Sequence, residues 1–140
     1  MKLSIFNKER NGSGRVTSNV RSVNVNRKNG GFVFSLALSE SIGMKKGEYV
    51  MFAKDEDSKS DWYMCVTQSD LGYAIFQKSG GKAEIRTRSL YATSKFAAQG
   101  ILDDVKAKRA ASFLVAMKPV EMDGLKWYRI ITDRPLRITN

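Results

Sequence analysis

Two stretches of the chain follow one plan, and they decide the expected fold. The first reads Val25-Asn26-Arg27-Lys28-Asn29-Gly30-Gly31-Phe32, and the second, 50 positions later, reads Ile75-Phe76-Gln77-Lys78-Ser79-Gly80-Gly81-Lys82. In each, an alternating run reaches a Lys-(Asn/Ser)-Gly-Gly turn and then alternates again, which is typical of a β-hairpin. We therefore expect two hairpins in equivalent places.

A helix and a second hairpin are expected after each of these turns. The two later hairpins share a frame, in which an apolar strand ends in Lys and a polar turn leads to Trp-Tyr-x-x-x-Thr. Matching elements in the same order indicate an internal duplication. The expected helices span residues 39–45 and 93–109, and the expected strand pairs span 49–54 with 62–67 and 113–118 with 127–132.

The fold class predicted from this order is α+β. Internally duplicated ββ-α-ββ units are expected to form an antiparallel-rich sheet or barrel with two helices, packed about a pseudo-twofold axis. No Pro-rich or Gly-rich break separates the units, so residues 19–140 are expected to be one domain, with repeat one at about 19–70 and repeat two at about 71–140. Residues 1–18 are expected to be a flexible basic arm, because Asn11-Gly12-Ser13-Gly14 is typical of a linker.

Local patterns refine the expected elements. Phe32, Phe34, Leu36 and Leu38 alternate with other residues, so we expect them to share the core face of one strand. Ser39 is the expected N-cap of the first helix, which we expect to end near Gly47. The second helix is expected to bury Ile101, Leu102 and Val105 and to carry Lys106, Lys108 and Arg109 at its C-terminal end.

The composition excludes several classes of chemistry. The chain has no histidine, so Ser-His and Cys-His nucleophile pairs and most transition-metal sites are excluded. Cys65 is the one cysteine, which excludes an intrachain disulfide, and we expect it to be a small buried apolar residue. No apolar run reaches the roughly 20 residues of a membrane span, and the first residues do not resemble a signal peptide. We expect a cytoplasmic protein that is not an enzyme and uses no metal or other cofactor.

The net charge of +10 favours a polyanionic partner. Residues 1–30 hold seven basic residues against Glu9, a net charge of +6. We expect nucleic acid rather than a membrane surface, because this basic stretch lacks the wide apolar face of an interfacial helix. The alternative is that the charges only keep the protein soluble.

The acidic run Asp55-Glu56-Asp57-Ser58-Lys59-Ser60-Asp61 fails as a calcium loop. Lys59 stands at a ligand position, the required glycine is absent, and Val66 replaces the final glutamate. We expect a solvated hairpin turn there.

Aromatic and basic residues on the expected strands are the candidate binding residues. Neighbours on a strand face opposite sides, so one residue of each Trp-Tyr pair is expected in the core and the other is free to stack on a base. The alternative is that helices or dimer contacts cover both rings. The candidates for stacking are Tyr63, Tyr73 and Tyr128. The candidates for phosphate contacts are Lys8, Arg10, Arg15, Arg21, Arg27, Lys28, Lys78, Lys82, Arg86 and Arg88.

Residues 20–67 resemble the AbrB-type swapped-hairpin domain. The resemblance rests on Val20-Arg21-Ser22-Val23, an apolar strand, and Leu38-Ser39-Glu40-Ser41-Ile42-Gly43-Met44-Lys45-Lys46-Gly47-Glu48 before a hairpin. It implies a dimer that binds duplex DNA. The family's strand-ending proline is absent near Phe34-Ser35.

The order ββ-α-ββββ-α-ββ is similar to a circular permutation of two ββββα units. Such units form the Whirly and transcriptional-coactivator-type fold, which binds single-stranded DNA and is common among phage proteins. This resemblance covers most of the chain after residue 18 and implies single-stranded DNA as the ligand.

The function expected from these observations is non-enzymatic nucleic-acid binding. Single-stranded DNA would lie on a basic, aromatic-bearing β-sheet. An AbrB-like regulator of duplex DNA and a phage or virion assembly protein that binds protein partners stay open as alternatives. No membrane partner is expected, and homo-oligomer formation stays open.

Overall fold

The computed structural model describes residues 20–57, 61–77 and 89–140. The elements in these residues are β1 (Ser22–Asn26), β2 (Gly31–Phe34), α2 (Leu36–Ile42), β3 (Tyr49–Lys54), β4 (Trp62–Thr67), β5 (Tyr73–Ala74), β6 (Phe76–Gln77), β7 (Leu90–Thr93), α3 (Lys95–Asp104), β8 (Ala110–Val115), β9 (Val120–Met122), β10 (Leu125–Ile131) and β11 (Arg137–Thr139).

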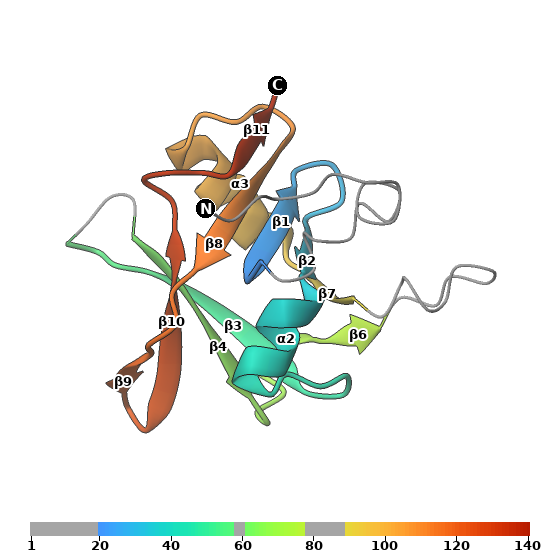
Figure 1. The fold of residues 1–140 in the computed structure, drawn as a ribbon, viewed down its shortest axis with the longest axis vertical. Helices are drawn as coiled ribbons and strands as arrows, with labels where there is room; N and C mark the ends of the chain where they lie inside the picture. The colour runs from blue at the N-terminus through green and yellow to red at the C-terminus, as the bar shows by residue number, and fades with distance from the viewer. Residues whose placement is uncertain (1–19, 58–60, 78–88) are drawn as a thin grey trace, which may run out of the picture.

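The described strands form one antiparallel sheet that curls into a nearly closed barrel (Figure 1). The hydrogen-bonded order is β5-β3-β4-β10-β8-β1-β2-β7-β6, with β11 beside β8 and β9 beside β10. The two ends of this path meet, because only Ile75 separates β5 from β6. The expectation of an α+β fold with an antiparallel-rich sheet or barrel and two helices is confirmed for the described residues.

The core fills the inside of the barrel, with buried side chains from β1, β2, β3, β4, β7, β8 and β10 and from Ile75 between β5 and β6. Strand alternation points every second side chain inward, as with Val23 and Val25 on β1, both fully buried. Helix α3 adds Ile101 and Leu102, which are also fully buried. Burial of side chains of this size contributes about 1.5–3 kcal/mol each, so this layer is the main source of stability.

The two halves of the barrel are paired in the same way. β3 pairs with β5 through Val50 and Tyr73, and β8 pairs with β1 through Phe113 and Val23. The ladders of β3 with β4 and of β1 with β2 likewise have counterparts in β8 with β10 and in β6 with β7. Each strand of the first half therefore corresponds to a strand of the second half that has the equivalent partners, and exchanging the two halves preserves the pairing. β1 corresponds to β5 and β6 at an offset of 50 residues, β2 to β7 at 60, β3 to β8 at 63 and β4 to β10 at 66.

Two residue pairs lie on the axis of this exchange. Tyr63 faces Arg129 between β4 and β10, and Phe32 faces Ala92 between β2 and β7. Each pair maps onto itself when the halves are exchanged. These registers describe pairing rather than descent, so duplication of the sequence stays a prediction.

Both helices end in the same backbone arrangement. The N–H groups of Met44 and Ala107 each donate to the carbonyl five residues earlier, at 2.8 and 2.9 Å. Such a bond around a left-handed residue is a Schellman motif. The left-handed residue is Gly43 (φ 69°) after α2 and Lys106 (φ 60°) after α3, and these two positions correspond at the offset of 63 residues.

The first hairpin turn is confirmed, whereas the second, at Lys78 to Lys82, lies outside the described residues. β1 and β2 pair up to Asn26 and Gly31, and Gly30 occupies the turn with φ 71°. The acidic run is a connection between β3 and β4 as expected, with Glu56 and Asp57 exposed, and its residues 58–60 lie outside the description.

The expected start of the first helix is wrong by three residues. Ser35, not Ser39, is the N-cap, because its hydroxyl accepts the Leu38 N–H at 3.1 Å and also donates to the Val20 carbonyl at 2.6 Å. β2 therefore stops at Phe34, and Leu36 and Leu38 are helical residues. Leu38 is buried, but Leu36 is 39% exposed, so the four-residue core face of the expectation is wrong.

The second half also differs from its expected bounds. Ser94 caps α3, which ends at Asp104, so the three cations expected in its last turn lie in the loop before β8. β8 begins three residues earlier than expected, and β10 two residues earlier. Ile101 and Leu102 are buried as expected, and Val105 is half-buried after the helix.

The two Trp-Tyr pairs do not occupy corresponding positions. Trp62 is buried in the core and faces Ile130 across the β4–β10 ladder, whereas in the other pair Tyr128 packs against the core. By the pairing register Trp62 corresponds to Tyr128, whereas the sequence match aligns Trp62 with Trp127. The shared Trp-Tyr frame is therefore not a structural repeat.

The close approach at Gly30 gives a first testable prediction. A Cβ at Gly30 would meet the backbone of Lys95 at 2.7 Å, whereas a Cβ at Gly124 (φ 76°) would meet nothing within 4 Å. Gly124→Ala should lose about 1 kcal/mol of unfolding free energy through its positive φ, and Gly30→Ala about 3 kcal/mol or more. Equilibrium urea unfolding measures both, and equal losses would contradict the contact with Lys95.

Candidate nucleic-acid interface

Arg21, a predicted phosphate ligand, is engaged within the fold. Its guanidinium donates from Nη1 to the Val115 carbonyl at 3.2 Å, from Nη2 to the Ala116 carbonyl at 3.0 Å and from Nε to the Ser41 hydroxyl at 2.9 Å. These bonds tie the start of β1 to the end of β8 and to α2. Arg21 is thus a structural residue in this arrangement.

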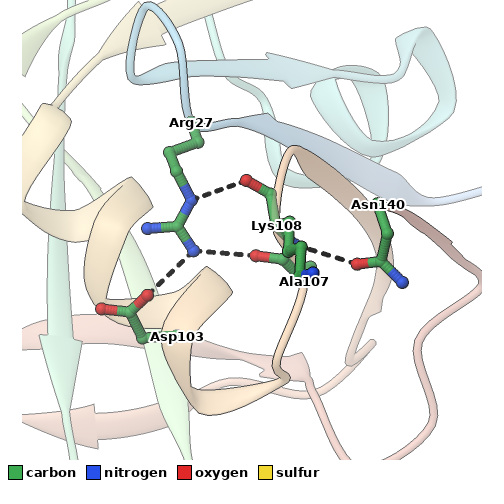
Figure 2. A network of polar contacts seen from close by, with 5 residues as sticks. All are labelled: Arg27, Asp103, Ala107, Lys108 and Asn140. Carbon is green, nitrogen blue, oxygen red and sulfur yellow. Dashed lines mark hydrogen bonds and ion pairs between the residues drawn. The ribbon is translucent and has the colours of Figure 1, made fainter.

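Arg27 is engaged in the same manner at the other end of β1 (Figure 2). Nε donates to the Lys108 carbonyl at 3.0 Å, and Nη2 donates to the Ala107 carbonyl at 2.8 Å. Nη2 also forms an ion pair with Asp103 at 2.8 Å. The Lys108 N–H in turn donates to the Asn140 side-chain oxygen at 3.0 Å. Arg27 therefore fixes the loop between α3 and β8.

Of the other predicted phosphate ligands, one is described by the structure and seven lie outside the described residues. Lys28 is exposed in the β1–β2 turn. The structure does not describe Lys8, Arg10, Arg15, Lys78, Lys82, Arg86 or Arg88.

The three predicted stacking tyrosines are not brought together. Tyr73 is 41% exposed, and its ring lies 6.2 Å from that of Phe52, which stacks on buried Phe32. Tyr63 is half-buried on the outer side of β4, and Tyr128 packs against the core. Tyr73 thus extends an aromatic series from buried Phe32 to the surface, while half-buried Tyr128 lies against the core.

An aromatic cluster that the sequence-based set of candidates omitted lies on the outside of the barrel. Tyr49 faces Ala74 across the β3–β5 ladder, and Phe76 faces Tyr91 across the β6–β7 ladder. Ala74 and Phe76 are two residues apart and share a side, since buried Ile75 points the other way. We call Tyr49, Phe76 and Tyr91 the aromatic face.

The aromatic face is partly open to solvent, since Phe76 is exposed and Tyr49 and Tyr91 are half-buried, and cations lie near it. Phe76 is 51% exposed, with its ring centroid 5.6 Å from that of Tyr91. A cleft of about 500 Å³ runs beside it, lined by Tyr49, Phe76 and Lys46 among others. Lys45 and Lys46 are both exposed in the loop before β3. The combination of open rings and nearby lysines suits a ligand with both flat rings and negative charge.

A second cleft adjoins the first. It has a volume of about 440 Å³, lies between α2 and the ends of β6 and β7, and shares Lys46 and Gln77 with the first cleft. Both volumes fall in the range of sites for small organic groups.

The corresponding positions in the other half carry no aromatic residue. The register carries Tyr49 onto Ser112, Ala74 onto Asn24 and Phe76 onto Asn26. There the Ser112 hydroxyl donates to the Asn24 side-chain oxygen at 3.0 Å. Because the same ladder forms with polar residues, the rings of the aromatic face are not required by the fold.

Other chemistry finds little support in the described part of the chain. No group of three or more His, Cys, Asp or Glu side chains there is placed to hold a metal ion. Cys65 is buried, as expected, and burial raises the pKa of its thiol. Within the same ranges no helix is long and apolar enough to cross a membrane.

Comparison with family models, with curated proteins and with solved structures finds no match for this chain.

Arg27 and Lys28 provide a second testable prediction, because adjacent cations have different surroundings. Arg27→Ala removes two charge-assisted bonds to carbonyls and should lower the unfolding free energy by about 2 kcal/mol. Lys28→Ala removes an exposed side chain and should change it by less than about 0.5 kcal/mol. Both are measured by urea unfolding, and an Arg27→Ala protein of unchanged stability would remove its structural role.

Proposed function

We propose that the protein binds single-stranded nucleic acid, DNA in the first instance, without catalysing a reaction. The observation that carries the proposal is the aromatic face, where half-exposed Phe76 lies against Tyr91 beside a cleft that Lys46 lines. A nucleobase presents a flat ring and its strand presents a phosphate at every step. Both groups have a counterpart here.

The mechanism would combine stacking with charge neutralisation. A base stacked on an aromatic ring contributes about 1–3 kcal/mol without reading the sequence. Lys45 and Lys46 would neutralise phosphates and release counterions, which makes affinity salt-dependent. The nearby carboxylate of Glu48 is engaged, since it accepts the Lys45 N–H at 2.9 Å and the Gln68 amide at 2.6 Å.

Single strands are favoured over duplexes because stacking needs a free base. In a duplex the base faces are covered by their neighbours, so the exposed ring of Phe76 would find no partner. The AbrB-like alternative, in which a duplex is bound, predicts instead that the aromatic face is dispensable. A virion assembly protein would bind no nucleic acid even at low ionic strength.

Phe76 and Phe96 give a third testable prediction. Both rings are exposed, by 51% and 88%, but Phe96 lies on α3 and outside the aromatic face. Phe76→Ala should weaken binding of an oligothymidylate of about 20 nucleotides by roughly 5- to 100-fold, and Phe96→Ala should leave it unchanged. Fluorescence anisotropy of labelled DNA measures both.

Two further strands separate stacking from charge. An abasic strand of equal length should bind Phe76→Ala and the parent protein alike, because it has no base to stack. A duplex of equal length should compete weakly. Duplex competition as strong as that of the single strand would support the AbrB-like alternative, and equal effects of the two Phe variants would overturn the stacking site.

A further inference from the structure

The loop between α3 and β8 corresponds to the loop between α2 and β3, which carries Lys45 and Lys46 beside the aromatic face. The offset of 63 residues that carries β3 onto β8 also carries Lys45 onto Lys108 and Lys46 onto Arg109. Both pairs are exposed. The two halves therefore present a cation pair at corresponding places, in the loop that leads into β3 in one half and into β8 in the other.

Lys106 occupies a backbone position that favours glycine. It has φ 60°, and the corresponding residue after α2 is Gly43, with φ 69° and the same hydrogen bonds around it. A side chain in the left-handed region is disfavoured relative to glycine. Lysine at such a position places an exposed cation there at the expense of stability, which is the kind of trade found at binding sites.

The surroundings of Lys106 form a cationic hollow. A cleft of about 370 Å³ is lined by Arg27, Asp103, Lys106, Ala107 and Lys108. Its one carboxylate, Asp103, already pairs with Arg27. Figure 2 shows the bonds from Arg27 to the carbonyls of Ala107 and Lys108, which hold the backbone of this loop in shape.

Further exposed cations lie on neighbouring segments of the chain. The Arg109 carbonyl accepts the Arg27 N–H at 2.9 Å, which brings Arg109 beside the turn that carries Lys28. Arg137 on β11 faces Ser112 on the outer side of the sheet. We call this surface the basic face; its residues are Lys28, Lys106, Lys108, Arg109 and Arg137.

We propose that the basic face is a second phosphate-binding surface for the nucleic-acid strand, one that contacts the backbone and no base. It rests on the proposed function and deepens it. The positions that correspond to Tyr49 and Phe76 of the aromatic face are Ser112 and Asn26 here, which are polar and cannot stack on a base. In this proposal the aromatic face binds bases of the nucleic acid, and the basic face binds its phosphates.

Lys106→Gly tests the trade between stability and binding. Glycine suits the left-handed position, so Tm should rise by about 3 °C. Loss of one phosphate contact should weaken binding roughly fivefold at about 0.1 M salt, for the oligothymidylate and the abasic strand alike. A residue with a purely structural role would show the first effect without the second.

A charge-matched pair of variants tests the location. Lys108→Ala/Arg109→Ala and Lys118→Ala/Lys126→Ala each remove two exposed cations, and the second pair lies on the β9–β10 hairpin and its approach. The first variant should reduce the slope of log K against log salt by about 1.4, at about 0.7 per phosphate contact on a single strand. The second should leave the slope unchanged. Thermal unfolding of both variants establishes that they fold.

The outcomes separate this proposal from the one on which it depends. No binding of either strand by the parent protein would overturn the proposed function. Binding that responds equally to the two charge-matched variants, with an unchanged affinity of Lys106→Gly, would overturn the basic face alone and leave the aromatic face intact.

Discussion

The architecture depends on one short segment, residues 73–77, which joins the two ends of the nearly closed barrel. β5 pairs with β3 in the first half, and β6 pairs with β7 in the second. Ile75 between them is buried, and its N–H and carbonyl bond to Glu48 and Gly47 at 2.9 and 3.1 Å. The segment that joins the ends of the barrel thus adds Ile75 to the core and places Phe76 on the outside. The aromatic face therefore depends on the same strand pairing that joins the two ends.

The two halves share their strand pairing but carry different residues on the aromatic face and the basic face. Corresponding strands pair in corresponding registers, so the ladder and the core account for the backbone in both halves. Strand pairing therefore does not determine which side chains stand at equivalent outer positions. Rings stand on one side of the molecule and asparagine and serine on the other, which is why we assign the two surfaces different chemical tasks.

The sequence was most informative where local chemistry decides the structure. The Lys-Asn-Gly-Gly turn, with a glycine at positive φ, and the apolar strands β3 and β4 could be predicted because each follows from its own residues. The start of α2 could not, since Ser35 and Ser39 are both good caps and the choice depends on a bond from Ser35 to Val20, outside the helix.

The candidate site was harder to predict because it depends on register. Arg21 and Arg27 were expected to bind phosphate, and no property of the sequence reveals that backbone carbonyls of distant segments engage them. The alternation in Tyr73-Ala74-Ile75-Phe76 does place Phe76 away from Ile75. Only the pairing with β7 shows that Tyr91 joins it.

The pairs on the exchange axis carry one more consequence. In a symmetric pair of identical chains, a residue on the axis meets its own copy, so a phenylalanine would face a phenylalanine and an arginine an arginine. Here Phe32 faces Ala92 and Tyr63 faces Arg129. A large ring is thus paired with a methyl group, and an aromatic side chain with a cation. Because the two halves belong to one polypeptide and differ in sequence, the residues on the axis need not be self-complementary and can differ in size and charge.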